Sequence, residues 1–234
     1  MQITGATALV TGANRGIGRH LAAQLLERGA TVYAAARRPE SVDLPGARVL
    51  ALDITDPEAV AAAAAAAGDV DLLVNNAGIS TGAGLATGDL DAARREMDVN
   101  FWGTLGVVRA FAPVLAANGG GAIVNVASAL SWFAAPGAGA YAASKAAVWN
   151  MSNAVRLELA GQGTLVTSVH LGAADTDMMG DYEGPKTDPA DVARVVLDGV
   201  EAGRIEVVVD DWSEMVKASL AKDPAEFYER LLRG

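Results

Sequence analysis

Seven short apolar runs, separated by stretches of helical periodicity, limit the folds open to this chain more than any other feature. The runs lie at residues 6–12, 30–36, 47–55, 71–78, 122–128, 164–172 and 204–210. They are continuously apolar and do not alternate with polar residues, which is typical of parallel strands covered on both faces. Together with right-handed crossovers, this pattern predicts an α/β fold with a doubly wound, mostly parallel seven-stranded sheet, Rossmann-like, and helices on both faces.

Helices are expected between and after these runs. The predicted segments are 17–29, a helix opened by Asp56-Pro57 that includes the alanines 61–67, 89–117, 139–160, 189–202 and two short helices at the end of the chain. Because no linker composition or internal repeat interrupts the pattern, we expect one dinucleotide-binding domain over residues 1–234. Ligands of such sheets bind beyond the carboxyl ends of the strands.

Composition excludes several classes of function. The net charge of −10 disfavours nucleic acid and anionic membrane surfaces as partners. The absence of cysteine excludes disulfides, thiol catalysis and thiolate metal sites. His20 and His170 form no metal-ligand pattern, so we expect packed or surface histidines and no metal site. We see no signal peptide and no run of about 20 apolar residues, and we therefore expect a cytoplasmic protein.

The first apolar run leads into the sequence TGANRGIG, residues 11–18, which carries Gly12, Gly16 and Gly18 just before a helix. Glycines at these positions would let the backbone approach a phosphate, and the helix N-terminus would attract its charge. The spacing G-x-x-x-G-x-G differs from the standard G-x-G-x-x-G, and such loops also occur as plain strand–helix turns. In this setting the loop predicts a bound dinucleotide.

Basic residues suggest which dinucleotide binds. The second run ends at Ala36, where an acidic residue would favour a ribose hydroxyl, and Arg37 and Arg38 follow. Arg15 lies inside the glycine loop. Guanidinium groups favour a 2′-phosphate, so the pattern predicts NADP(H) over NAD(H). The alternative is a solvated basic turn, which would leave the preference open.

In order and spacing, further motifs resemble the short-chain dehydrogenase/reductase family, in its compact subfamily, over about residues 5–177. They are TGANRGIG, LDIT at 52–55, NNAG at 75–78, DVNFWG around Asn100, Ser128 placed 13 residues before Tyr141, YAASK at 141–145 and LGAADT at 171–176. Leu171 stands where the family usually has proline, which leaves the stiffness of that loop open. Together with the loop and the arginines, the resemblance implies cofactor contacts from Gly12, Asn14, Arg15, Gly16, Ile17, Gly18, Arg37, Arg38, Asp53, Ile54, Asn76, Ala77, Gly78, Tyr141, Lys145, Gly172 and Thr176.

Tyr141 and Lys145 lie one helical turn apart, on one face of the predicted helix. A tyrosine can give a proton to a reduced carbonyl oxygen, but its ordinary pKa of about 10 makes it a poor base. An ammonium about 4 Å away could lower that pKa by about three units at an effective dielectric of about 20. We therefore expect a depressed tyrosine pKa, with a snorkelling lysine beside a packed tyrosine as the alternative.

The resemblance implies roles for the other catalytic candidates. Ser128 would hydrogen-bond the carbonyl oxygen, Lys145 would also hold the nicotinamide ribose, and Asn100 would hold a water for proton resupply. Ser128 could instead simply end a strand, with Ser131 as a rival at the wrong spacing. Asn100 could be a helix-interior residue bonded to backbone.

The substrate side is less defined by sequence. The residues expected to line it are Ile79, Leu130, Trp132, Phe133, Ala173, Met178, Met179 and Tyr182, each of which could equally be core or lid packing. This apolar set suits a small apolar ketone, aldehyde or alcohol. Residues 177–188 contain two glycines and a proline, and we expect them to form a mobile loop over the substrate.

Three classes of function remain open on sequence. The favoured one is an NADPH-dependent carbonyl reductase or alcohol dehydrogenase. A non-catalytic NADP-binding regulator and an isomerase or epimerase on the same fold are the alternatives. The resemblance also implies pairing through the helices that hold Asn100 and Tyr141, in a homodimer or homotetramer.

Overall fold

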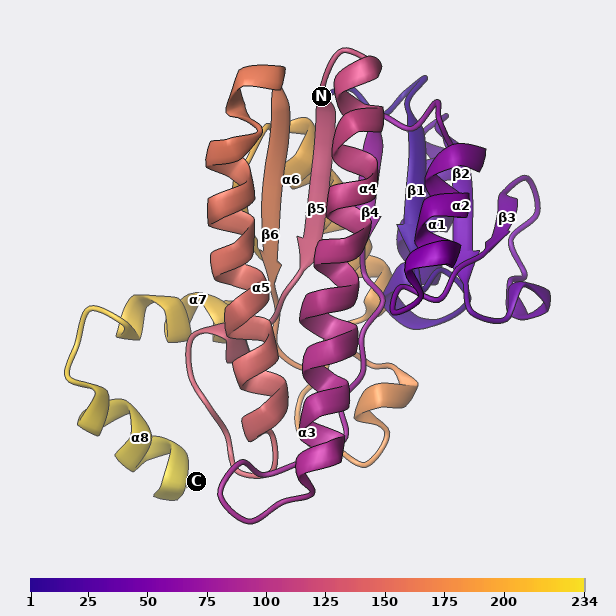
Figure 1. Cartoon of the computed structure of the whole chain (residues 1–234). Coiled ribbons are helices and arrows are strands. Elements are labelled where there is room, and N and C mark those ends of the chain that lie inside the picture. The colour runs from indigo at the N-terminus through magenta and orange to yellow at the C-terminus, as the bar shows by residue number, and fades with distance from the viewer. Residues whose placement is uncertain (234) are drawn as a thin grey trace.

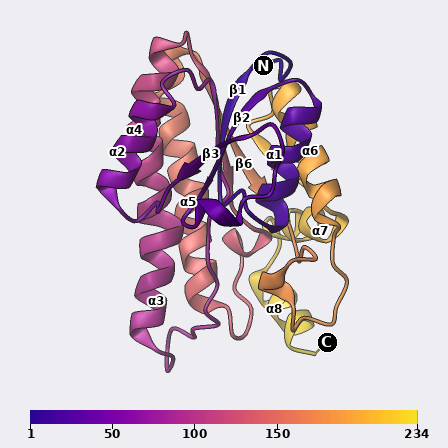
Figure 2. The same cartoon turned by 90° about the vertical axis from the view of Figure 1, so that its right-hand side faces the viewer.

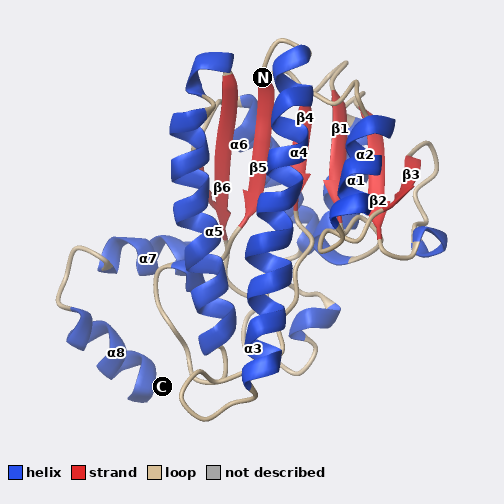
Figure 3. Cartoon of the chain, viewed as in Figure 1, coloured by secondary structure: helices blue, strands red, loops and turns tan. Residues whose placement is uncertain are grey.

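The computed structural model, which describes residues 1–233, contains one sheet of seven strands flanked by helices (Figure 1, Figure 3). The strands are β1 (Thr7–Thr11), β2 (Thr31–Ala36), β3 (Arg48–Ala51), β4 (Leu72–Asn75), β5 (Gly121–Val126), β6 (Thr164–His170) and β7 (Glu206–Val208). Their order is β3-β2-β1-β4-β5-β6-β7, and every neighbouring pair is parallel. The predicted doubly wound fold is confirmed, with a sheet that is wholly parallel.

The predicted helices are also present. They are α1 (Gly16–Glu27), α2 (Pro57–Ala66), α3 (Leu90–Met97), α4 (Thr104–Ala117), α5 (Gly139–Glu158), α6 (Pro189–Glu201), α7 (Asp211–Ser219) and α8 (Pro224–Arg233). A π-helical turn, Asp98–Gly103, joins α3 to α4, so the predicted helix at 89–117 is continuous but locally widened.

Two apolar layers attach the helices to the sheet. Figure 2 shows α1 and α6 on one side and α2, α4 and α5 on the other. Leu21 of α1 and Val196 of α6 are fully buried in the first layer, and Phe111 and Leu115 of α4 are fully buried in the second. The strands β1, β2, β4, β5 and β6 are buried on both faces, which explains why their sequences are continuously apolar, whereas the edge strand β3 is largely exposed.

The alanine-rich helix α2 has the thin packing face that its sequence predicts. Asp56 caps it by accepting a hydrogen bond from the backbone N–H of Glu58. Ala63 in this helix and Ala67 just after it are buried against the second layer. Their small side chains allow a close approach to the sheet.

Among the described residues, the continuous stretch Leu90–Ala117 is long and apolar enough to span a membrane by length and composition alone, with a mean hydropathy of 1.3. Core helices of soluble proteins meet the same test. Val107, Phe111 and Leu115 in this stretch are buried against the sheet. The apolar face of α4 therefore has a protein partner.

The carboxyl ends of the parallel strands lie at one edge of the sheet, with α7 and α8 nearby (Figure 1). Successive strands are added on one side of β1 up to β3, and on the other side from β4 onward. This reversal places a switch point beyond β1 and β4, where ligands of such sheets bind.

Candidate active site

The glycine loop after β1 brings backbone atoms unusually close together. Gly12 and Gly16 adopt φ values of 66° and 53°, which favour glycine. A Cβ atom at Gly18 would lie only 2.2 Å from the carbonyl oxygen of Gly12. The loop therefore requires glycine at these positions, and it forms a cradle that side chains would fill.

The cradle ends at the N-terminus of α1, which fits an anionic group. No described side chain caps this helix, and its first turn contains no acidic residue. The first backbone N–H groups lack intrahelical partners and carry the positive end of the helix dipole. These features fit the pyrophosphate of a dinucleotide. Ile17 lies in the first turn of α1, and Thr176 approaches Gly16.

Arg15 and the residues after β2 provide positive charge beside this cradle. The guanidinium of Arg15 lies 2.9 Å from the carboxylate of Asp177, which ties the loop to the predicted substrate lid. Arg37 and Arg38 are exposed at the end of β2. Ser41, which the sequence reasoning did not single out, accepts a hydrogen bond from Asn14 and donates one to the carbonyl of Arg38. A ribose phosphate in this corner would meet guanidinium and hydroxyl groups.

Asp53 follows β3 near the same corner, and Ile54 beside it is buried. Partial burial raises the pKa of Asp53, but hydrogen bonds from the backbone and hydroxyl of Thr55 and the charge of Arg37 lower it more. The net shift of this pKa is downward, so the carboxylate is ionised at neutral pH. An ionised Asp53 can accept hydrogen bonds from an adenine amino group.

Thr11 organises the NNAG segment and was not singled out by sequence. Its hydroxyl accepts hydrogen bonds from the backbone N–H groups of Asn76 and Ala77, each at 3.0 Å. The amide of Asn76 donates in return to the carbonyl oxygens of Thr11 and Gly12. This pairing fixes the floor between β1 and β4. A threonine directly before the first loop glycine was the available signal.

Asn100 lies in the π-helical turn, and both polar atoms of its side chain are hydrogen-bonded within the protein. Its Oδ1 accepts from the N–H of Ile79, and its Nδ2 donates to the carbonyl of Ile79 and to the hydroxyl of Ser144. Ser144 donates in turn to the carbonyl of Tyr141. The side chain therefore connects the segment after β4 to α5, as in the backbone-bonded alternative. The predicted water contact of Asn100 stays a prediction.

The other predicted catalytic residues converge beyond β5. Ser128 caps the short turn Ala129–Ser131, and its hydroxyl accepts from the N–H of Leu130 at 3.1 Å. The Ser128 hydroxyl also interacts with the phenol of Tyr141, the third residue of α5. Lys145 places its Nζ 5.5 Å from the centroid of the tyrosine ring. The rival hydroxyl of Ser131 is instead used to accept from the N–H of Ser128.

The expected depression of the tyrosine pKa is wrong for this structure. Burial raises the pKa of Tyr141 to about 12, the contact with Ser128 lowers it only in part, and the charge of Glu96 raises it further. Lys145 is only 4% exposed, and burial lowers its pKa to about 8. Its Nζ donates to the carbonyl of Val126 at 2.8 Å. Desolvation is the largest cause of both pKa shifts, and spacing alone could not reveal it.

The predicted substrate residues differ in exposure and in packing. Ile79, Ala173 and Met179 are half-buried, whereas Met178 and Tyr182 are exposed on the 177–188 segment. Phe133 is buried against Trp212 and Phe227 of the C-terminal helices, and Leu130 packs on the same cluster. The sequence reasoning missed these two helices as neighbours of the site. Asp210 accepts from the N–H of Gly172 at 2.7 Å, which fastens α7 to the loop after β6.

The two histidines are placed differently. His170 is fully buried and stacks on Trp132 with ring centroids 4.1 Å apart, whereas His20 is half-buried on α1. Within residues 1–233, no three His, Asp or Glu side chains are grouped to hold a metal ion.

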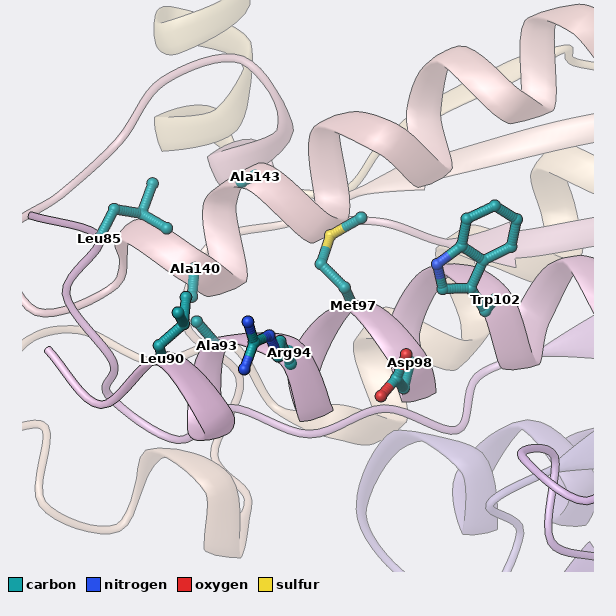
Figure 4. Close-up of a pocket in the computed structure, with 9 residues that line it drawn as sticks. All are labelled: Leu85, Leu90, Ala93, Arg94, Met97, Asp98, Trp102, Ala140 and Ala143. Atoms are coloured by element: carbon teal, nitrogen blue, oxygen red, sulfur yellow. The ribbon is translucent and has the colours of Figure 1, made fainter.

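A surface cavity of about 360 Å³ is lined by α3, the loop before it, the π-helical turn after it and the start of α5 (Figure 4). Its lining residues are Leu85, Leu90, Ala93, Arg94, Met97, Asp98, Trp102, Ala140 and Ala143. None of the predicted catalytic side chains lines it. Leu85, Leu90 and Trp102 are more than half exposed, so this cavity forms part of an apolar outer face.

Known proteins are similar to this chain in sequence, and solved structures are similar to it in fold. The short chain dehydrogenase family matches residues 6–186. The putative oxidoreductase SadH of Mycobacterium tuberculosis is 33% identical, over 97% of this chain and 94% of that protein. A 2-dehydro-3-deoxy-L-rhamnonate dehydrogenase (NAD(+)) of Sphingomonas is 36% identical, over 70% of each chain.

A solved structure gives the strongest support. The crystal structure of a short chain dehydrogenase from Burkholderia cenocepacia in complex with NADP is similar with a TM-score of 0.95 and 42% identity, over 99% of each chain. The family match, the parallel sheet and the glycine cradle at its switch point agree. The chain therefore belongs to the short-chain dehydrogenase/reductase family of oxidoreductases.

Proposed function

We propose that the protein is an NADP(H)-dependent oxidoreductase that interconverts a small apolar carbonyl compound and its alcohol, with the phenol of Tyr141 as the acid in reduction and its tyrosinate form as the base in the reverse direction. The observation that carries this proposal is the convergence of Ser128, Tyr141 and Lys145 beyond β5. A phenol, a hydroxyl and an ammonium at one point can bind a carbonyl oxygen and supply a proton to it.

Different groups of the chain would hold different parts of the cofactor. When bound, the nicotinamide supplies or accepts the hydride. The open N-terminus of α1 and the glycine cradle would hold the pyrophosphate. A Cβ atom at Gly78 would lie 3.5 Å from the Nζ of Lys145, so the lysine reaches the floor between β4 and α5, where it could hold a ribose hydroxyl.

The proton chemistry follows from the two pKa shifts. A Tyr141 pKa of about 12 keeps the phenol protonated at neutral pH, which suits carbonyl reduction. As the carbonyl carbon gains hydride, the phenol gives its proton to the oxygen, and Ser128 donates a hydrogen bond to the developing charge. With a pKa of about 8, Lys145 can exchange a proton near neutral pH and reprotonate the tyrosinate.

NADP(H) is favoured because Arg37 and Arg38 follow β2 on an exposed corner that also holds Ser41. The NADP complex of the Burkholderia dehydrogenase supports this choice. The Sphingomonas relative is named for NAD(+), so the arginines rather than the family carry the preference.

A regulator that binds NADP without turnover, or an isomerase, would use the same fold. The presence of Tyr141, Lys145 and Ser128 in one cluster favours the oxidoreductase over a binding-only protein.

We also propose that the protein is cytoplasmic and that it forms a homodimer or homotetramer through the face of α3 and α5 shown in Figure 4.

The test is NADPH oxidation by the purified protein against a panel of apolar ketones, aldehydes and quinones. We expect net cofactor oxidation with at least one ketone or aldehyde, and a Ser128→Ala variant that binds NADPH but turns over about 100-fold more slowly. Tight NADPH binding with no turnover across the panel would support the regulator. Isomerisation of an added substrate with no net change in NADPH would support the isomerase.

A further inference from the structure

His170 contacts the backbone carbonyl of Ser128, a group that has no part in the proposed proton transfer. It is the last residue of β6, its side chain is 0% exposed, and its Nδ1 lies 3.0 Å from the carbonyl oxygen of Ser128. The backbone N–H of Ser131 donates to the same carbonyl at 3.0 Å. Two donors therefore fix the peptide group that follows Ser128.

The hydrogen bonds determine the tautomer of His170. A carbonyl oxygen only accepts, so Nδ1 must carry the proton. Burial lowers the pKa of His170 to about 4, so the ring is neutral at pH 7 and its Nε2 is an acceptor. The hydroxyl of Ser168 lies 3.3 Å from Nε2 and can donate to it. Each ring nitrogen thus has a partner of the correct kind.

Aromatic packing fixes the plane of the imidazole. Trp132 stacks on it at 4.1 Å with an interplanar angle of 15°, and Trp149 meets its edge at 85°. The ammonium of Lys217 lies 5.9 Å from the centroid of the Trp132 ring. It also pairs with Glu206, whose carboxylate is 3.8 Å from Nε2. The stacked ring of Trp132, the edge of Trp149 and the hydrogen bond to the Ser128 carbonyl therefore limit rotation of the imidazole.

We propose that His170 is a positioning residue for catalysis, which acts by holding the Ser128 carbonyl so that the Ser128 hydroxyl stays directed at the carbonyl oxygen of the substrate. The Ser128 backbone is extended, with φ −172° and ψ 160°, and it turns directly into the short helix Ala129–Ser131. Without the hydrogen bond from His170, the Ser128 carbonyl would keep only the N–H of Ser131 as a donor, and a resulting tilt of the peptide group would move the hydroxyl. The inference rests on the proposed function, because it requires Ser128 to act in turnover.

Core packing is the competing role for His170, and two substitutions separate it from positioning. Asparagine places its amide nitrogen where Nδ1 lies, whereas glutamine places its amide near Nε2. Both remove the stacked ring beside Trp132, and asparagine, which is one methylene shorter, leaves the larger gap. If His170 only packs, His170→Asn should therefore be no better than His170→Gln.

The experiment measures kcat and KM with NADPH and a reducible ketone for wild type, His170→Asn and His170→Gln. We expect His170→Gln to lower kcat about tenfold, the effect of losing one hydrogen bond that orients a reacting group, with the Kd for NADPH unchanged. His170→Asn should restore most of that loss. Equal kcat values for the two variants would overturn the proposal.

Measuring kcat of His170→Asn and His170→Gln in a Ser128→Ala background shows whether their difference depends on the serine hydroxyl. We expect the difference between Asn and Gln to disappear there, because the hydroxyl to be positioned is gone. If the tenfold difference persists in that background, His170 acts by another route and the proposal fails. If Ser128→Ala alone keeps wild-type turnover, the proposed function of Ser128 fails instead.

A measurement on the wild-type protein does not depend on how well the variants fold. The chain has two histidines, so ¹⁵N-detected imidazole signals of His170 can be distinguished from those of His20. We expect a neutral His170 protonated on Nδ1 at pH 7. A neutral ring protonated on Nε2 would contradict the hydrogen bond on which the proposal depends.

Discussion

At the residue scale, Lys145 buries an ammonium group beside a backbone carbonyl. Its pKa of about 8 lies below the ordinary value of 10.5, so the unfolded chain binds the proton more tightly. Burial of the charged lysine therefore lowers the free energy of unfolding by its full amount below pH 8, and this destabilisation disappears as the pH rises toward 10.5. A functional group that reduces stability in this way is expected at an active site.

Replacement of Lys145 by methionine should therefore stabilise the folded chain. The shift of about 2.5 units corresponds to up to about 3 kcal/mol at pH 7, partly offset by loss of the hydrogen bond to Val126. Urea unfolding of both proteins from pH 7 to pH 10 would measure it. We expect the gain to shrink with rising pH, while a gain that is constant with pH would show that the lysine is not strained by burial.

Arg37 is the residue on which the cofactor preference can be tested. Arg37→Gln should raise the Michaelis constant for NADPH about 10-fold or more and leave that for NADH nearly unchanged, because only the 2′-phosphate loses a charged partner. Arg109→Gln, at an exposed arginine on α4, is the control. Equal increases for both cofactors would disprove the assigned role of Arg37.

Some properties of single residues could be predicted from the sequence, and others could not. The spacing of Ser128, Tyr141 and Lys145 predicts that they meet, and they do. The direction of the tyrosine pKa shift was predicted wrongly because burial raises this pKa, and so does the charge of Glu96, which is distant in sequence. The role of Thr11 could not be predicted because its partners, Asn76 and Ala77, lie in the segment after the neighbouring strand β4.

At the element scale, the π-helical turn Asp98–Gly103 determines where the side chain of Asn100 lies. The helical period of residues 89–117 predicts a helix there but carries no signal for one widened turn. The turn contains Asn100, whose amide pairs with both backbone groups of Ile79 and with Ser144. Such widened turns often occur at functional sites.

Removal of the Asn100 amide should loosen the segment after β4. Asn100→Ala leaves the N–H and carbonyl of Ile79 unpaired in a partly buried place, which should lower the free energy of unfolding by about 2–4 kcal/mol. Hydrogen exchange should then accelerate at residues 79–81 before the strands. Wild-type protection of these amides would mean that other contacts hold the segment.

At the scale of the whole molecule, the parallel sheet and the helical layers on its two faces were predictable because continuous apolar runs admit few parallel arrangements. The position of α7 and α8 was not, since it depends on contacts of Phe133 with Trp212 and Phe227. These residues lie far apart in sequence and carry no motif. The predicted mobility of residues 177–188 stays a prediction.

Assembly is a further property of the whole molecule. The outer face of α3 and α5 exposes Leu85, Leu90 and Trp102 around the cavity of Figure 4. Light scattering at micromolar concentration should give a dimer or tetramer, and Trp102→Glu should shift it toward monomer because a charge would enter an apolar interface. A monomeric wild-type protein would exclude this interface.

The central claim is that the phenol of Tyr141 transfers the proton while the chain holds a reduced nicotinamide. Its most direct test measures NADPH affinity and ketone turnover in Tyr141→Phe, which removes one oxygen and leaves the ring in place. We predict a Kd for NADPH within a few-fold of wild type and a kcat lower by roughly 100- to 10,000-fold. Wild-type turnover in this variant would contradict the account.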